Sequence, residues 1–435
     1  MSENALGSQG SSKLHPRHTR RAMEDDSAHA VAEEPPLALP DHPSIPRGAA
    51  AWVDTADALH ELLTHLRQSG AFAYDSEFIG ETSYIPRLCV IQIATRHRVA
   101  LVDPLARLDL SAFWELLTDP GIQKIVHAGE QDLEPVFRIT ARPPANVIDT
   151  QIAAGFCGLA YPTSLSKLVR EVVGARLGKG FTFTHWDRRP LSPVQQRYAA
   201  DDVRFLPALR DELGKRLDRL GHLAWALEES ASLCDPSRYA IDLDSDPLRL
   251  RGSSGLPPRN LAILRELYAW REQAARQADL PPRSFLKDHL LIDLARQPIH
   301  SVKDLARVKG LPRPVEAEHG QRILDATQRA ALLPAEQLPR SHSHEESPSQ
   351  RFGTESLWVA AQAICLGQSV DPALATSRAD IAQFHRAFMR EQNTDGHRLM
   401  RGWRGQALGE ALAAMLREGR NMRLGWRDGA LATGP

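Results

Sequence analysis

The sequence contains no long uninterrupted run of apolar residues. A helix that spans a membrane needs about 20 such residues, and no run of even about 18 occurs in this chain of 435 residues. The basic residues near the N-terminus, from Lys13 to Arg21, are not followed by an apolar stretch either. We therefore expect neither a membrane span nor a secretory signal.

Paired cysteines and a surplus of charge are also missing. The four cysteines, Cys89, Cys157, Cys234 and Cys365, are too scattered for a zinc site or a disulfide framework, so we expect a cytoplasmic protein. The formal net charge of -1 excludes a basic character of the whole chain, and any contact with nucleic acid must come from local patches. One candidate patch is the segment 251–330, which holds 14 Lys or Arg residues against nine Asp or Glu.

The length of the chain predicts several domains, because 435 residues exceed one ordinary hydrophobic core. Ser, Pro, His and charged residues dominate residues 1–48, which we expect to be disordered. Two further polar or Pro-containing stretches indicate linkers. The expected parts are a disordered extension (1–48), an α/β domain (49–235), a linker (236–258), a helical domain (259–334), a second linker (335–353) and a second helical domain (354–428).

Hydrophobic periodicity predicts the order of elements in the α/β domain. Three strands come first and pair antiparallel, and short buried strands then alternate with helices. This order predicts a mixed α/β sheet with helices on both faces. After a first strand that begins at Phe72, strands are expected at residues 88–94, 98–102, 124–127 and 147–149, and a long helix at residues 193–213.

The first strand carries two carboxylates. Asp75 and Glu77 are two positions apart in an apolar run, so both side chains face the same side of the strand. Two half-buried carboxylates repel each other and lose hydration unless a cation lies between them. A divalent metal ion would satisfy this pair, and a solvated acidic edge of a sheet is the alternative.

Two later segments add acidic side chains. Asp132 lies shortly after His127 and would occupy the first turn of a helix, where interaction with the helix dipole is the alternative explanation. Tyr198 and Asp202 are four residues apart, hence on one helix face, although such a pair is common by chance. With the first pair, these segments supply four carboxylates, as two Mg²⁺ ions held by a protein require.

The three segments resemble, in order, the exonuclease motifs of the DEDD superfamily, in its tyrosine-bearing branch. They are Asp75-Ser-Glu-Phe, His127-Ala-Gly-Glu-Gln-Asp-Leu and Tyr198-Ala-Ala-Asp-Asp-Val. The connecting sequence is similar to that of the ribonuclease D family in Ile148-Asp-Thr-Gln-Ile-Ala-Ala-Gly and in Trp186-Asp-Arg-Arg-Pro-Leu. The resemblance spans residues 51–428.

The helical part of the chain extends this resemblance. Residues 259–330 resemble the HRDC domain, a small nucleic-acid-binding module, and Asp371-Pro-Ala-Leu-Ala-Thr-Ser-Arg with Gly402-Trp-Arg resembles the second helical domain of ribonuclease D. Two features depart from the family pattern. Ser76 replaces the usual Thr, and we expect its hydroxyl to point away from the carboxylates. The stretch 178–184 is less polar than in the family, which bears on substrate preference.

The resemblance implies a ribonuclease H-like sheet with a metal-dependent 3′→5′ exoribonuclease site. Tyr198 would orient the attacking water rather than take its proton, since an unperturbed phenol has a pKa of about 10. The expected products are nucleoside 5′-monophosphates, the expected partners are tRNA precursors and other structured RNAs, and we expect a monomer. The ligands of two Mg²⁺ or Mn²⁺ ions would be Asp75, Glu77, Asp132 and Asp202.

Four further residues are candidate contacts to the substrate. His127 and Arg188 could each contact a phosphate, but a histidine at a strand end is more often structural, and the arginine could instead pair with a neighbouring carboxylate. Lys303 and Lys309 flank a basic helix before Gly310, whose turn would offer backbone N–H groups to phosphates. A solvated helix face is the alternative for the two lysines.

Two other functions fit the same residues. The site would also serve a 3′→5′ exonuclease of single-stranded DNA, although two helical domains and the lack of a polymerase or helicase segment favour RNA. A catalytically inactive nucleic-acid-binding protein would be favoured if one metal-ligand position were substituted. All four carboxylates and Tyr198 are present, so we favour an active enzyme.

Overall fold

The computed structural model describes residues 39–178, 185–339, 347–419, 423–427 and 430–434. The expectation of disorder over residues 1–48 is wrong for its last part, because residues 39–48 pack on the α/β domain. Ile45 is only 3% exposed, and a guanidinium nitrogen of Arg204 donates to the main-chain oxygens of Pro46 and Gly48 at 2.6 and 3.0 Å. Residues 1–38 and most of the stretch 178–184 lie outside the described residues.

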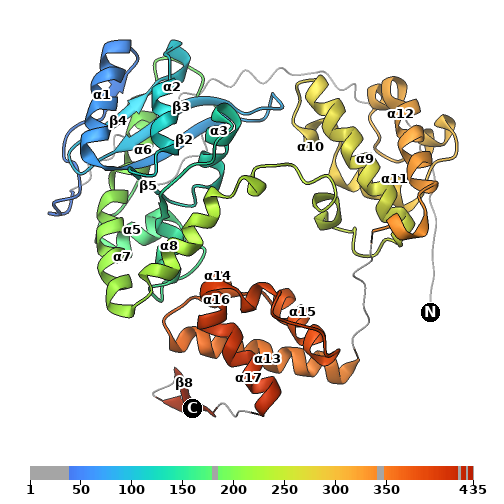
Figure 1. Cartoon of the computed structure of the whole chain (residues 1–435). Helices are drawn as coiled ribbons and strands as arrows, with labels where there is room; N and C mark the ends of the chain where they lie inside the picture. Colours follow the sequence, from blue (N-terminus) through green and yellow to red (C-terminus); the bar gives the residue numbers. More distant parts are fainter. Residues whose placement is uncertain (1–38, 179–184, 340–346, 420–422, 428–429, 435) are drawn as a thin grey trace, which may run out of the picture. The chain divides into compact units, whose positions relative to one another are not determined.

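A six-stranded sheet forms the middle of the α/β domain (Figure 1). Its order is β1-β4-β3-β2-β5-β6; β3 pairs antiparallel with β2 and β4, whereas β1, β5 and β6 join parallel to a neighbour. The sheet is mixed, as the sequence predicts, but β1 was not predicted because three residues show no periodicity. The strands are β1 (Ala51–Val53), β2 (Ala71–Ile79), β3 (Arg87–Ala94), β4 (Val99–Val102), β5 (Gln123–Val126) and β6 (Val147–Asp149).

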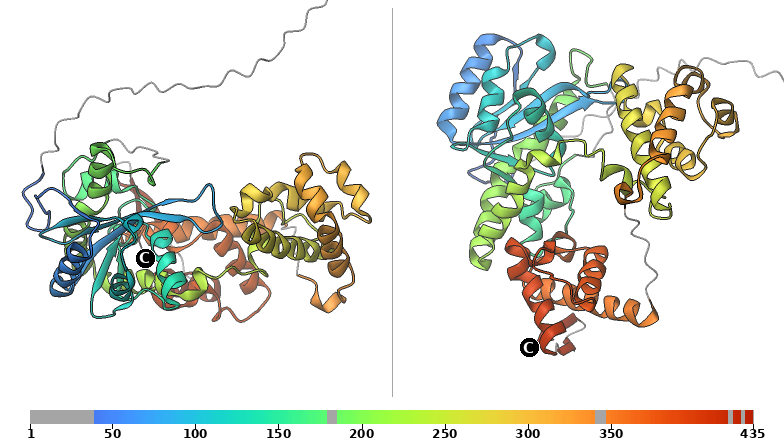
Figure 2. Two further views of the ribbon diagram at one scale, coloured as in Figure 1. Left: turned by 90° about the horizontal axis from the view of Figure 1, so that it is seen from above. Right: turned by 45° about the vertical axis from the view of Figure 1, so that its right-hand side comes forward.

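Helices cover both faces of this sheet (Figures 1 and 2). α6 packs on the face to which Val90 and Leu101 point, and α2 packs on the other face, where the rings of Phe113 and Tyr74 lie 6.0 Å apart. The helix expected at residues 193–213 is divided into α6 and α7, because Pro207 has no N–H to continue the hydrogen-bond ladder. The helices are α1 (Ala56–Ser69), α2 (Ser111–Thr118), α3 (Glu130–Thr140), α4 (Thr150–Gly155), α5 (Leu165–Val172), α6 (Pro193–Arg204), α7 (Leu206–Leu220) and α8 (Leu223–Ala231).

Two irregularities of β2 prepare the site. β2 pairs with β5 only over residues 71–73, so its edge beyond that point is not paired with β5. On the side of β3 the register shifts between Glu77 and Phe78, and Cys89 is the extra residue of a β-bulge. The open edge gives room for another element beside the carboxylates of β2.

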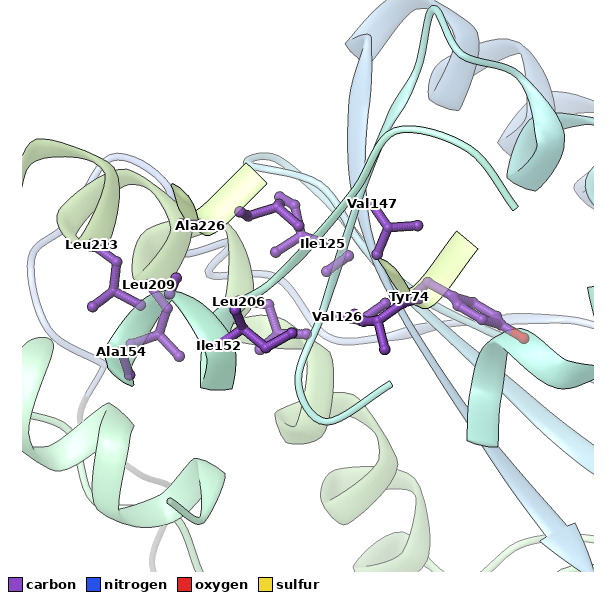
Figure 3. Packing of buried hydrophobic residues seen from close by; sticks show 14 of the residues in the cluster. Tyr74, Ile125, Val126, Val147, Ile152, Ala154, Leu206, Leu209, Leu213 and Ala226 are labelled. Atoms are coloured by element: carbon purple, nitrogen blue, oxygen red, sulfur yellow. The ribbon is translucent and has the colours of Figure 1, made fainter. Parts of the chain in front are cut away.

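Buried apolar side chains hold the strands and helices of the α/β domain together (Figure 3). Tyr74, Ile125 and Val126 belong to the strands, and Leu206 and Leu209 face them from α7. Each fully buried side chain of this size contributes about 1.5–3 kcal/mol. The sheet is therefore a rigid support for side chains at its surface.

Residues 258–331 form a helical domain with its own apolar core. Leu256, from the expected linker 236–258, belongs to this core. The basic segment before Gly310 is a 3₁₀-helix rather than the expected ordinary helix, and its first turn is closed by Ser301 and Asp304. The elements are α9 (Pro258–Gln277), α10 (Pro282–Phe285), α11 (Asp288–Arg296), the 3₁₀-helix η5 (Val302–Arg307) and α12 (Arg313–Ala331).

The second helical domain shares a hydrophobic core with the α/β domain. The ring of Trp403 lies 4.6 Å from that of Phe156, and the Arg404 guanidinium binds both carboxylate oxygens of Glu229 at 2.6 and 2.7 Å. The expected helical character fails at residues 423–427, which form a strand, because Gly419 at φ +64° ends the last helix. The elements are α13 (Pro348–Gly367), α14 (Pro372–Ala375), α15 (Arg378–Met389), α16 (Gly402–Arg404), α17 (Glu410–Glu418), β7 (Arg423–Arg427) and β8 (Ala430–Gly434).

None of the helices in the described ranges has the length and apolar character needed to cross a membrane.

Candidate active site

The strand β2 fixes two of the predicted carboxylates. Asp75 lies opposite Gln92 and Glu77 opposite Val90 on β3, so the two acidic side chains share the face on which α6 packs. Gln92 is completely buried, and its amide nitrogen lies 3.5 Å from a carboxylate oxygen of Glu77. The sequence prediction that one face of this strand is acidic is therefore confirmed in the arrangement of the strands.

The helix α6 brings Tyr198 and Asp202 to the same face. Its first turn is closed by a reciprocal hydrogen-bond pair between Ser192 and Gln195, with Pro193 at the first helical position, so the helix starts at a defined residue. Tyr198 and Asp202 lie one turn apart, and their side chains are hydrogen-bonded to each other. The hydrogen bond therefore limits the movement of both side chains above β2.

A tight turn before α3 places the remaining carboxylate. Ala128 adopts a left-handed φ of 55°, and a Cβ at Gly129 would lie 2.6 Å from Val126. The buried Asp149 carboxylate accepts the N–H groups of both turn residues at 3.1 Å, and it also caps α4. This turn starts α3 beside the open edge of β2, with Asp132 in the first helical turn.

The four carboxyl groups surround one cavity of about 440 Å³, which Tyr198 and His127 also line. Burial first, and then neighbouring carboxyls, raise the pKa of Glu77 to about 8 and that of Asp202 to about 7. The pKa of Asp75 is also well above its ordinary value, because of burial first and then of Asp132, Asp202 and Glu77. No Lys or Arg is present among the described residues that line the cavity. The protein alone leaves this acidic charge uncompensated.

The chemistry of this donor set fits divalent cations that prefer oxygen ligands, such as Mg²⁺ or Mn²⁺. In the described ranges, however, no three acidic, histidine or cysteine side chains already form a group that could hold a metal ion. Asp75 and Asp132 instead share a hydrogen bond, as two carboxyls do when one keeps its proton. Small side-chain rotations would be needed for the carboxylates to converge on a cation.

Sequence reasoning missed the role of Ser76. The expectation that its hydroxyl points away from the carboxylates holds for Asp75 and Glu77, because Ser76 faces the opposite side of β2. The same hydroxyl, however, donates a hydrogen bond of 2.6 Å to Asp132. No spacing rule could reveal this contact, because α3 reaches β2 around the open edge of the strand.

The predicted substrate contacts are distributed over different parts of the chain. Both ring nitrogens of His127 are engaged, one with Thr150 and the other with the main-chain oxygen of Thr163, at 3.0 and 3.1 Å. This arrangement favours the structural alternative, although His127 does line the cavity. A phosphate contact by His127 stays a prediction.

The arginine of this set is Arg188, which lies at the surface. Arg188 is exposed, and within the described residues its guanidinium has no ion-pair partner. The neighbouring Arg189 instead forms the structural pair, with both oxygens of Asp103 at 2.7 Å. Arg188 is therefore available to a ligand.

Lys303 and Lys309 are exposed in the helical domain 258–331 and are not among the residues that line the cavity. Lys303 belongs to η5, and Lys309 follows this helix, directly before Gly310 at φ +88°. The two lysines therefore belong to a separate surface.

A strand with an acidic pair, an acidic helix start and a Tyr–Asp helix, all around one cavity, define a nuclease of the 3′→5′ exonuclease class. Residues 50–218 match the family model for 3′-5′ exonuclease domains, and residues 260–327 match the HRDC domain.

Known relatives narrow this class. The chain is 35% identical to ribonuclease D of Gluconacetobacter diazotrophicus, over 85% of this chain and 93% of that protein, and 31% identical to ribonuclease D of Shewanella sp. (strain ANA-3), over 84% and 93%. It is also similar to the crystal structure of Escherichia coli RNase D, an exoribonuclease involved in structured RNA processing, with 30% identity and a TM-score of 0.74, covering 85% of this chain and 99% of that one. The chain belongs to the ribonuclease D family, and it is a 3′→5′ exoribonuclease.

Proposed function

We propose that the enzyme trims the 3′ ends of structured RNAs, tRNA precursors among them, and releases nucleoside 5′-monophosphates by hydrolysis that depends on two divalent metal ions. The observation that carries the proposal is the convergence of four carboxyls from β2, α3 and α6 on one cavity that holds no cationic side chain among its described lining residues. The exonuclease family is dependent on divalent metal ions. The proposed ligands are Asp75, Glu77, Asp132 and Asp202.

Two bound Mg²⁺ or Mn²⁺ ions would acidify water and stabilise charge on the phosphate and on the leaving 3′ oxygen. The side chains of the protein have complementary tasks. Asp75 shares one face of β2 with Glu77 and is hydrogen-bonded to Asp132 on α3, so it would contribute to cation binding together with both of these carboxylates. A carboxylate that contacts side chains of both β2 and α3 connects the two elements that carry the proposed ligands.

Tyr198 is suited to orient water rather than to take its proton. Burial and the nearby carboxylates raise its pKa above the ordinary phenol value, so the phenolate form is even less accessible near neutral pH. The hydrogen bond to Asp202 fixes the phenol group above the cavity. An O–H group in a fixed place can hold a water molecule in a defined orientation by a hydrogen bond.

A structured substrate accords with the domains outside the catalytic one. RNase D of Escherichia coli is an exoribonuclease involved in structured RNA processing, and the HRDC region of this chain presents Lys303 and Lys309 at its surface. Non-specific contacts to phosphates would hold the body of an RNA while its 3′ end enters the cavity. The monomeric state and the cytoplasmic location stay predictions.

The deciding experiment compares a 3′-extended tRNA with a single-stranded DNA of equal length, each with Mg²⁺, with Mn²⁺ and with EDTA. We expect stepwise shortening of the RNA from its 3′ end, release of 5′-monophosphates and no reaction in EDTA. Asp75→Asn should abolish nearly all activity and leave the fold intact. A preference for DNA would contradict the proposed substrate. RNA binding without degradation would indicate the inactive nucleic-acid-binding protein.

A further inference from the structure

Ser76 connects β2 to the first turn of α3. It is 8% exposed, and its hydroxyl donates to Asp132 Oδ1 over 2.6 Å, which is short for such a bond and typical of a charged acceptor. A hydroxyl that donates to one carboxylate oxygen limits the rotation of the whole carboxylate. The other oxygen of Asp132 then has a defined direction.

Tyr74, two residues earlier on the same face of β2, reinforces this connection. Its phenol O–H donates to the main-chain oxygen of Asp132 over 2.9 Å, and the phenol ring is fixed by packing on Phe113. Tyr74 is only 1% exposed, so its position varies little. β2 therefore holds the same residue of α3 by its main chain and by its side chain.

The open edge of β2 explains why such a connection is needed. Beyond Ala73, β2 no longer pairs with β5, so no ladder of backbone hydrogen bonds fixes the distance between this part of β2 and α3. Residues 74–77 nevertheless carry half of the carboxylates around the cavity. The hydroxyls of Tyr74 and Ser76 replace the missing backbone bonds at this point.

We propose that Ser76, supported by Tyr74, is a positioning residue that directs the Asp132 carboxylate toward the divalent cations of the active site. The role rests on the proposed function, because it gives Asp132 a task in cation binding. Hydrogen-bond partners of ligating carboxylates orient those ligands, and their loss typically weakens metal binding or activity about 10–100-fold. We expect a loss of the same size in metal binding when the hydroxyl of Ser76 is removed.

The chain offers a matched control for a purely structural effect. Ser44 is 2% exposed, and its hydroxyl donates to Asp211 Oδ2 over 2.6 Å, at a place that does not line the cavity. Ser44→Ala thus removes the same kind of bond, of the same length, from another part of the same domain. Any effect that both variants share is an effect on stability alone.

The test measures Mn²⁺ binding directly, by calorimetric titration of the full-length protein and by the rise of the melting temperature with Mn²⁺. We expect Ser76→Ala to need about 10–100-fold more Mn²⁺ than the wild type, Ser76→Thr to bind as the wild type does, and Ser44→Ala to bind normally. Ser76→Cys keeps the volume and provides a second variant with a weak donor, should Ser76→Ala fail to fold. In activity assays, the Mn²⁺ concentration that gives half of the maximal rate should rise in parallel, with an unchanged KM for RNA.

Two results would overturn the role of Ser76. The role is overturned if Ser76→Ala and Ser76→Cys bind Mn²⁺ as well as Ser44→Ala does. In that case the proposed function still stands, provided that the wild type binds Mn²⁺ and degrades RNA. A wild-type protein that degrades RNA without binding Mn²⁺ or Mg²⁺ would overturn the proposed function and this role with it.

Discussion

Tyr198 is the residue whose chemistry departs most from a simple acid–base role. Its hydrogen bond to Asp202 and its raised pKa both favour a neutral phenol. We expect Tyr198→Phe to keep metal binding and to lower kcat, by up to about 100-fold, because a misplaced water is the main loss. Single-turnover kinetics at saturating Mg²⁺ measure this. Tyr239→Phe, which removes a phenol from outside the cavity, is the control, and equal rates for both variants would contradict the role.

Glu77 makes the stability of the metal-free protein depend on pH. The folded protein holds the Glu77 proton up to a pKa of about 8, whereas the unfolded chain releases it near the ordinary value of 4.5. The unfolded state then binds fewer protons between these values, so the free energy of unfolding falls as the pH rises through this window. We expect urea unfolding in EDTA to show this fall, and Glu77→Gln to reduce it.

The exposed Glu61 provides the comparison for this measurement. Glu61→Gln should leave the difference in unfolding free energy between pH 5 and pH 8 as it is in the wild type. The prediction fails if Glu77→Gln shows the same difference as the wild type. Added Mg²⁺ should reduce the fall in the wild type, since a bound cation favours the charged carboxylate.

At the scale of elements, Asp149 ties two helix starts together. Its carboxylate accepts N–H groups from the turn before α3 and from the first turn of α4. Asp149→Asn replaces one acceptor oxygen by a donor that faces other donors, so we expect a loss of about 1–3 kcal/mol in the free energy of unfolding together with lower activity. Asp109→Asn, at an exposed turn, should lose less. Chemical denaturation measures the free energy of unfolding of both variants, and equal losses in the two would contradict the prediction.

The elements show how far sequence patterns could lead. Periodicity located β3, α3 and α6, and the spacing of Asp75 and Glu77 gave the correct face of β2, because these features depend on neighbours along the chain. β1 was too short to show a pattern. The contact between Ser76 and Asp132 could not be predicted, because it depends on where β5 stops pairing with β2. Local patterns carry no information about such an edge.

At the scale of the whole molecule, part of the affinity for RNA should come from a surface that takes no part in catalysis. The surface with Lys303 and Lys309 lies outside the residues that line the cavity. We expect the double variant Lys303→Ala/Lys309→Ala to bind RNA more weakly and to reduce the salt slope of log Kd by about 0.7–0.9 per lost phosphate contact. Hydrolysis of a dinucleotide, too short to reach this surface, should be unchanged.

Titration of fluorescent RNA at several salt concentrations measures this slope. Lys215→Ala removes an exposed lysine that is paired with Glu212 on α7, and it should leave the slope as it is. An unchanged slope in the double variant would assign both lysines to an ordinary solvated surface, the alternative considered for this segment.

The bulge at Cys89 has a consequence for the changes of sequence that this chain tolerates. The extra residue of a bulge is left out of the pairing between the strands, so its presence matters more than its identity. Another small side chain could replace Cys89. A deletion at this place would remove the bulge and leave the pairs Glu77–Val90 and Phe78–Leu88 next to each other in a regular ladder, without the local bend and added twist of β3. Substitution of Cys89 is therefore tolerated, whereas loss of the residue would change the curvature of the sheet beside Glu77.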